Sequence, residues 1–152
     1  MITYEQLLIE SDKNNLVAKE KKLPISNGRI KGNRIAIKKG LSEKEKKCVL
    51  AEELGHYYTT SGNILDQNSA SNRKQEQLAR LWSYNKLIGL RGIINSHNAG
   101  CSNKYDMAEF LNVTIEFLEE AIKKYTDKYG VCTTLDNYVI YFIPNLGVME
   151  LI

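Results

Sequence analysis

Glu52, Glu53 and His56 lie within one short segment and carry side chains that could bind a metal ion and activate water. The segment falls in a predicted helix from Glu43 to about Thr60. Residues four apart on a helix lie one turn apart on the same side, so Glu52 and His56 could converge on one ion. Zinc accepts both imidazole nitrogen and carboxylate oxygen as ligands. A carboxylate beside such an ion, here Glu53, could accept a proton from water.

A further ligand, Glu76, is predicted on the next helix, which runs from Arg73 to about Leu90. Glu76, Ala79 and Ser83 share one stripe of that helix, a carboxylate followed by small side chains. Gly55 costs about 1 kcal/mol relative to alanine inside a helix, so its presence indicates that another backbone approaches closely. We therefore expect the small face of the second helix to pack on the first and to bring Glu76 to the same ion.

The alternative interpretation of the two glutamates and the histidine is a solvent-exposed helix face without a function. Composition alone favours it, because paired glutamates are common on exposed helices and one histidine among them is unremarkable. Gly55 and the matching stripe on the second helix favour a site.

The residues Val49–Thr59, followed by Glu76–Ser83, resemble the ImmA/IrrE family of metallopeptidases. The family pattern is H-E-x-x-H on one helix and E-x-x-A on the next, and the resemblance extends along the chain to Tyr129. It implies an α+β fold with a zincin-like minimal metallopeptidase core and a zinc-dependent endopeptidase activity. It also implies a protein substrate, namely a repressor that silences a phage or mobile element, so that the enzyme acts as an anti-repressor. His56 and Glu76 would then be metal ligands, and Glu53 the general base and acid.

The sequence departs from the family pattern at Glu52, which stands where the family has its leading histidine. A site with two carboxylates is more negative, which should raise the pKa of a metal-activated water. Harder oxygen donors could also shift the preference from zinc towards manganese or iron. We keep Glu52 as the third ligand, because its position on the helix survives the exchange. The alternative is an inactive peptidase-like protein that binds a repressor or toxin partner without cutting it.

The remaining pattern predicts an α+β architecture with small antiparallel sheets. We expect a metallopeptidase-like core at residues 1–100 and a C-terminal part at 101–152, packed together as one unit. The expected elements are a helix up to Lys13, a hairpin turning at Gly32–Asn33, a polar loop from Ser61 to Asn72, a loop from Asn95 to Asn103, helices at Tyr105–Leu111 and Ile115–Lys128, and a hairpin turning at Asp136–Asn137. Capping boxes at Thr3/Gln6 and Ser42/Glu45 start the first and central helices.

The cysteines, Cys48, Cys101 and Cys132, are odd in number and widely spaced, which is typical of reduced thiols in a cytoplasmic protein. The N-terminus lacks the pattern of a secretory signal, and no apolar run is long enough for a membrane span. We therefore expect a cytoplasmic protein with no membrane partner.

The charge is uneven along the chain. Residues 13–47 hold twelve Lys or Arg and three Glu, a net charge of +9, whereas the whole chain carries +3. A basic segment could meet an acidic partner or nucleic acid, but a solvated face of lysines is the preferred interpretation. The helical pair near Asn112 weakly resembles a helix-turn-helix, yet its second helix carries Glu116, Glu119 and Glu120, which phosphates would repel. The sequence therefore does not predict direct nucleic-acid binding.

Overall fold

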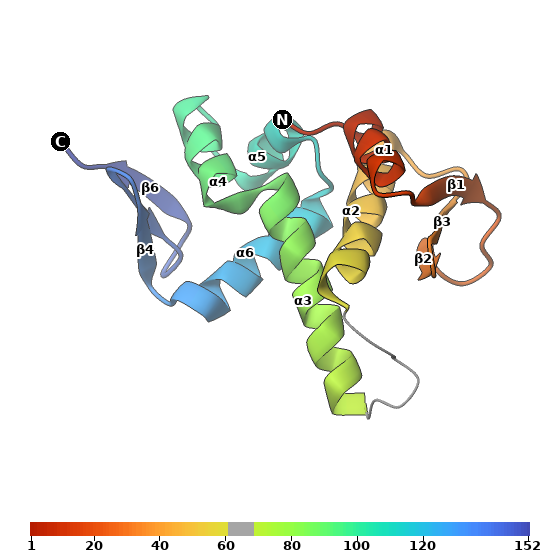
Figure 1. Ribbon diagram of the computed structural model, residues 1–152. Helices are drawn as coiled ribbons and strands as arrows, with labels where there is room; N and C mark the ends of the chain where they lie inside the picture. Colours follow the sequence, from red (N-terminus) through yellow and green to blue (C-terminus); the bar gives the residue numbers. More distant parts are fainter. Residues whose placement is uncertain (61–68) are drawn as a thin grey trace. The chain divides into compact units, whose positions relative to one another are not determined.

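The computed structural model describes residues 1–60 and 69–152, with only the backbone given for residues 69 and 70 (Figure 1). Its contacts divide the chain into two compact units, Met1–Ser83 and Tyr84–Ile152. The predicted division into domains at residue 100 therefore does not coincide with these units and stays a prediction. The α+β fold class is confirmed.

Within the described residues, the first unit contains three helices and a three-stranded sheet. The third helix continues past Ser83 into the second unit. The elements are α1 (Tyr4–Lys13), β1 (Val17–Lys21), β2 (Gly28–Lys31), β3 (Arg34–Lys38), α2 (Glu43–Thr59) and α3 (Ser69–Leu87). Both predicted capping boxes are present. Thr3 accepts from the backbone of Gln6, and Ser42 accepts from that of Glu45. Each cap satisfies an otherwise unpaired N–H group and fixes where its helix begins.

The sheet of the first unit has the order β1-β3-β2. The predicted hairpin is confirmed, because β2 and β3 pair antiparallel around a turn at which Gly32 has a φ of +60°. The pairing of β1 with β3 is parallel, which the sequence did not predict. Ile35 and Ile37 are buried and alternate along β3 with less buried residues.

Helices α1 and α2 cover one face of this sheet. Helix α1 contacts α2 and β1, while α2 contacts β2 and β3. Fully buried apolar side chains fill the space between them, among them Leu7, Ile37, Leu50 and Leu54. Each such side chain stabilises the fold by roughly 1.5–3 kcal/mol, so this core fixes the position of α2 against β2.

Two predicted boundaries near α3 are wrong. Most of the predicted loop from Ser61 to Asn72 lies outside the described residues, which resume at residue 69. Its predicted end at Asn72 is wrong, because α3 already begins at Ser69. The helix predicted to reach Leu90 ends at Leu87. A separate helix, α4 (Gly89–Asn98), follows where the sequence indicated a loop from Asn95.

The second unit holds the remaining helices and a second sheet. It begins with the end of α3 and with α4. The elements that follow are α5 (Lys104–Leu111), α6 (Ile115–Tyr129), β4 (Cys132–Leu135), β5 (Tyr138–Tyr141) and β6 (Gly147–Glu150). The helical pair α5 and α6 confirms the predicted hairpin, with Asn112 in the left-handed region and Thr114 capping α6. The predicted β4–β5 hairpin is also confirmed, and β6 extends it to an antiparallel sheet.

None of the helices within the described residues has both the length and the apolar character that a membrane crossing requires.

Candidate active site

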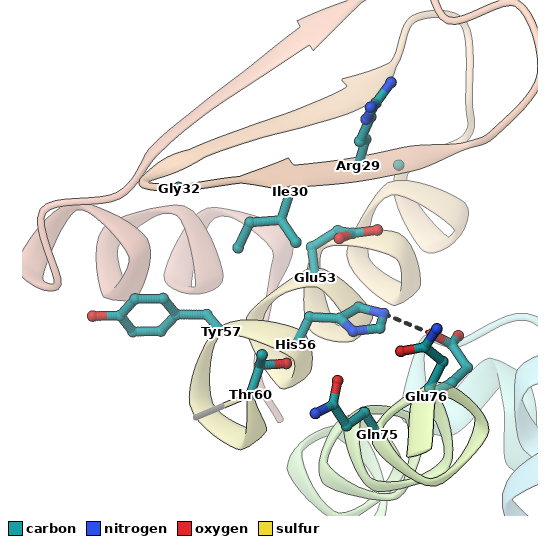
Figure 2. A pocket seen from close by; sticks show the side chains of 11 residues that line it. Arg29, Ile30, Gly32, Glu53, His56, Tyr57, Thr60, Gln75 and Glu76 are labelled. Carbon is teal, nitrogen blue, oxygen red and sulfur yellow. Dashed lines mark ion pairs between the residues drawn. The ribbon is translucent and has the colours of Figure 1, made fainter. Parts of the chain in front are cut away.

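A cavity of about 650 Å³ in the first unit brings together side chains from α2, α3 and β2 (Figure 2). Its walls are formed by Gly28, Arg29, Ile30, Gly32, Glu53, His56, Tyr57, Thr60, Asn72, Gln75 and Glu76. Three of the four predicted site residues therefore share one cavity: Glu53, His56 and Glu76.

His56 and Glu76 meet across the contact between α2 and α3. The Nε2 atom of His56 lies 3.0 Å from Oε2 of Glu76, and Figure 2 shows the two side chains pointing towards each other. Two ligands of one tetrahedral zinc ion, each about 2.0–2.1 Å from it, lie about 3.3 Å apart. The pair thus fits two positions of a zinc site, one nitrogen and one oxygen, with little rearrangement.

The close approach of the two helices depends on Gly55, as its position in the sequence predicted. A Cβ atom at Gly55 would overlap the carbonyl oxygen of Ala79 and would lie 3.0 Å from its carbonyl carbon. Ala79 and Ser83, the small residues of the α3 stripe, are fully buried. The small surfaces of both helices therefore bring Glu76 within reach of His56.

Arg80 holds the second oxygen of the Glu76 carboxylate. Its Nε donates to Oε1 of Glu76 at 3.0 Å, so the two carboxylate oxygens have different partners. Such a hydrogen bond orients a carboxylate and leaves Oε2 to face His56. Arg80 was not predicted from the sequence, although its spacing of four residues from Glu76 on one helix is a signal for such a pair.

Glu53 is buried beneath β2, with 8% of its surface exposed. Figure 2 shows its side chain rising from α2 towards the strand. A Cβ atom on Gly28 would lie only 3.0 Å from Oε1 of Glu53, so the glycine leaves space for the carboxylate. Burial, followed by the negative charges of Glu52 and Glu76, raises the pKa of Glu53 to about 7.

Glu52 is half-buried on α2 and does not line the cavity. Within residues 1–60 and 69–152, no group of three His, Cys, Asp or Glu side chains is arranged to hold a metal ion. The structure thus pairs His56 with Glu76 and does not add Glu52 to them. Its role as third ligand stays a prediction.

The two tyrosines after His56 have different surroundings. The ring of Tyr58 packs at a tilt of 33° against that of Trp82, with the centroids 4.9 Å apart. The Tyr58 hydroxyl accepts a hydrogen bond from Asn14 at 2.8 Å. Tyr57 lines the cavity and is 39% exposed. Figure 2 shows the Tyr57 side chain pointing away from His56 and Glu76.

The contribution of β2 to the site was missed at the level of sequence. Gly28, Arg29 and Ile30 all line the cavity, and β2 is an edge strand of its sheet. Nothing local in this segment indicates that it passes over Glu53, because the contact joins residues far apart in the chain.

Cys48 and His97 do not line this cavity. Cys48 is buried in α2. His97 belongs to the second unit and is exposed on α4.

Residues 11–123 match the family model Peptidase_M78, described as IrrE N-terminal-like domain, which is about three quarters of the chain. No curated protein and no solved structure matches the chain significantly. The matched range includes the α2–α3 pair and β2, so the cavity lies wholly inside the family domain. The chain therefore belongs to the IrrE N-terminal-like family of metallopeptidase-type proteins.

Proposed function

We propose that this protein is a metal-dependent endopeptidase that cleaves a repressor protein of a phage or mobile element in the cytoplasm. The observation that supports this most directly is the pair of His56 and Glu76, 3.0 Å apart on the wall of a cavity that also holds Glu53. Membership of the Peptidase_M78 family agrees with this chemistry. The repressor as substrate rests on the resemblance to the ImmA/IrrE family.

His56 and Glu76 would hold the metal ion, with Glu52 as the third ligand. Glu52 lies one helical turn before His56, so a rotamer change could bring its carboxylate to the same ion. When bound, a zinc ion would polarise the peptide carbonyl and make water easier to deprotonate. Because Glu52 replaces the usual histidine, manganese or iron could take the place of zinc.

Glu53 would act as the general base and then as the general acid. Its buried carboxylate faces the cavity, where it takes a proton from the attacking water and returns it to the amine that leaves. An extended substrate could pair with the edge of β2, which lies over Glu53.

The variant Glu53→Gln tests the assignment of the general base. Glutamine has the same shape but cannot accept the proton, so we expect cleavage of the repressor to fall by at least about 100-fold. Metal content should be unchanged, because Glu53 is not a proposed ligand. Cleavage would be followed by gel electrophoresis with the purified repressor encoded nearest to the gene, and metal content by mass spectrometry.

The matched control is Glu43→Gln, an exposed glutamate in the first turn of the same helix. It removes the same charge outside the cavity and should leave cleavage intact. Full cleavage by Glu53→Gln would contradict the proposed mechanism.

A second candidate function is an inactive peptidase-like protein that binds a repressor or toxin partner. The position of Glu52, which does not line the cavity with His56 and Glu76, favours this alternative. Partner binding that persists without metal and without cleavage would support it over the enzyme.

A further inference from the structure

The second face of the sheet in the first unit is strongly cationic. Alternation along the strands sends Ile35, Ile37 and Glu20 towards the helices, where Glu20 forms an ion pair with Lys46 of α2 at 3.1 Å. The residues that alternate with these along β1 and β3, and their partners on β2, point to the opposite face. These form the cationic sheet face, defined by Lys19, Lys21, Arg29, Lys31 and Arg34, and all five are exposed.

The strand register places these cations close together. Arg34 pairs with Lys31 on one side and with Val17 on the other, and Ala36 lies between Lys19 and Arg29. Neighbouring strands are about 4.8 Å apart, and alternate residues along one strand are about 6.6 Å apart. Five like charges at such distances repel one another, which is a cost to the folded state that an anionic ligand would remove.

The cationic sheet face is hollowed. A groove of about 460 Å³ is lined by all five cations together with Val17, Ile35 and Ala36. No acidic side chain lines it, and the part of the chain that the structure describes shows no ion pair for any of the five. Their charge is therefore available to a ligand.

Arg29 connects this groove to the candidate active site. It lines both the groove and the cavity that holds His56 and Glu76. Figure 2 shows Arg29 and Ile30 on opposite sides of β2, with Ile30 towards α2. A chain that leaves the cavity over the edge of β2 would meet the cationic sheet face next.

We propose that the cationic sheet face binds an acidic segment of the protein substrate and so contributes to the choice of substrate. An extended peptide with Asp or Glu at every second position repeats its carboxylates every 6.6 Å or so, the same spacing as the cations along each strand. Among the described residues, no aromatic side chain lines the groove, so it lacks the stacking surface on which single-stranded nucleic acid is usually bound. This inference rests on the proposed function, because it assumes a protein substrate.

The test measures binding and does not depend on cleavage. A fluorescein-labelled peptide of alternating Glu and Ser, its Gln-for-Glu counterpart and a labelled DNA duplex are titrated with the full chain at low ionic strength, with anisotropy as the readout. We expect the acidic peptide to bind most tightly. The triple variant Lys19→Gln, Lys31→Gln, Arg34→Gln should weaken its binding about tenfold, as expected for the loss of three exposed ion pairs.

The matched control removes the same charge elsewhere. Lys13, Lys74 and Lys123 are exposed and line neither the groove nor the cavity, so their triple exchange to Gln should change the affinity less than twofold. Circular dichroism and the melting temperature check that both triple variants fold. All exchanged side chains are exposed, so no loss of core packing is expected.

Two outcomes would overturn the inference: equal affinities for the acidic and Gln peptides, or tighter binding of the duplex through the same three residues. The latter would assign the face to nucleic acid. Tight, face-dependent binding of the acidic peptide in a protein that cleaves no substrate would contradict the proposed function and leave the assignment of the face intact.

Discussion

Glu76 is the residue on which the candidate site depends most. One of its carboxylate oxygens lies 3.0 Å from His56 Nε2, and the other accepts from Arg80 Nε at 3.0 Å. A carboxylate held in this way presents a single oxygen in a fixed direction. Arg80 is thus a positioning residue for Glu76.

The exchange Arg80→Met tests this positioning role. It keeps the length of the side chain and removes the donor, so we expect the affinity for zinc to fall about tenfold, a typical effect of removing a partner that orients a ligand. A competition titration with a zinc-sensitive dye measures the dissociation constant directly. Lys74→Met, an exposed residue on the same helix, is the matched control and should leave the affinity unchanged. An unchanged affinity in Arg80→Met would show that Glu76 needs no support.

The local spacing of the sequence predicted part of this site. His56, Glu53 and Glu76 could be predicted because each depends on helix periodicity or on a short family pattern, and the structure places all three on one cavity. Gly28 and Arg29 could not be predicted, because their place beside α2 depends on the packing of a distant strand. Glu52 satisfies the same periodicity and still does not line the cavity.

At the scale of the elements, the contact between α2 and α3 holds the site together. Gly55 lies directly against the backbone carbonyl of Ala79, and the α3 surface at that point consists of small buried residues. The carbonyl belongs to a helix and cannot move away as the end of a flexible side chain could. Any side chain at Gly55 would therefore push the two helices apart and separate His56 from Glu76.

The exchange Gly55→Ala measures the importance of this contact. Alanine gains about 1 kcal/mol in helix propensity, but the overlap with Ala79 should cost about 1–3 kcal/mol and outweigh it. We expect the free energy of unfolding in urea to fall by about 1 kcal/mol, together with a loss of zinc affinity. Gly147→Ala is the control, because a Cβ atom there has nothing within 4 Å. A Gly55→Ala variant more stable than the parent would contradict the packing described for the two helices.

The elements themselves were predictable wherever a local signal defines them. The capping boxes at Thr3 and Ser42 and the hairpin turn at Gly32 gave α1, α2 and the β2–β3 pair. Strand β1 was missed because its sequence has no apolar alternation, and its parallel partner β3 lies beyond β2 in the chain. Helix α4 was missed because its end is rich in polar residues. Ser96 is nevertheless compatible with a helix, since its hydroxyl donates to the carbonyl of Gly92.

In the molecule as a whole, much of the positive charge of the chain is concentrated on one face of the first sheet. The excess of Lys and Arg in residues 13–47 is not spread evenly over a solvated surface, because five of these cations line one groove of the first sheet. The sequence favoured a solvated face for these lysines. Part of that face is a concave, positively charged groove next to the candidate active site.

The metal content of the purified chain, measured by mass spectrometry after zinc or manganese has been supplied, tests whether His56 and Glu76 form a metal centre. We expect about one metal ion per chain. His56→Ala and Glu52→Ala should both lose it, and Glu43→Ala, exposed on the same helix, should keep it. Loss in His56→Ala alone would remove Glu52 from the ligand set. A wild-type chain that takes up neither metal would contradict the central claim that His56 and Glu76 form a metal centre.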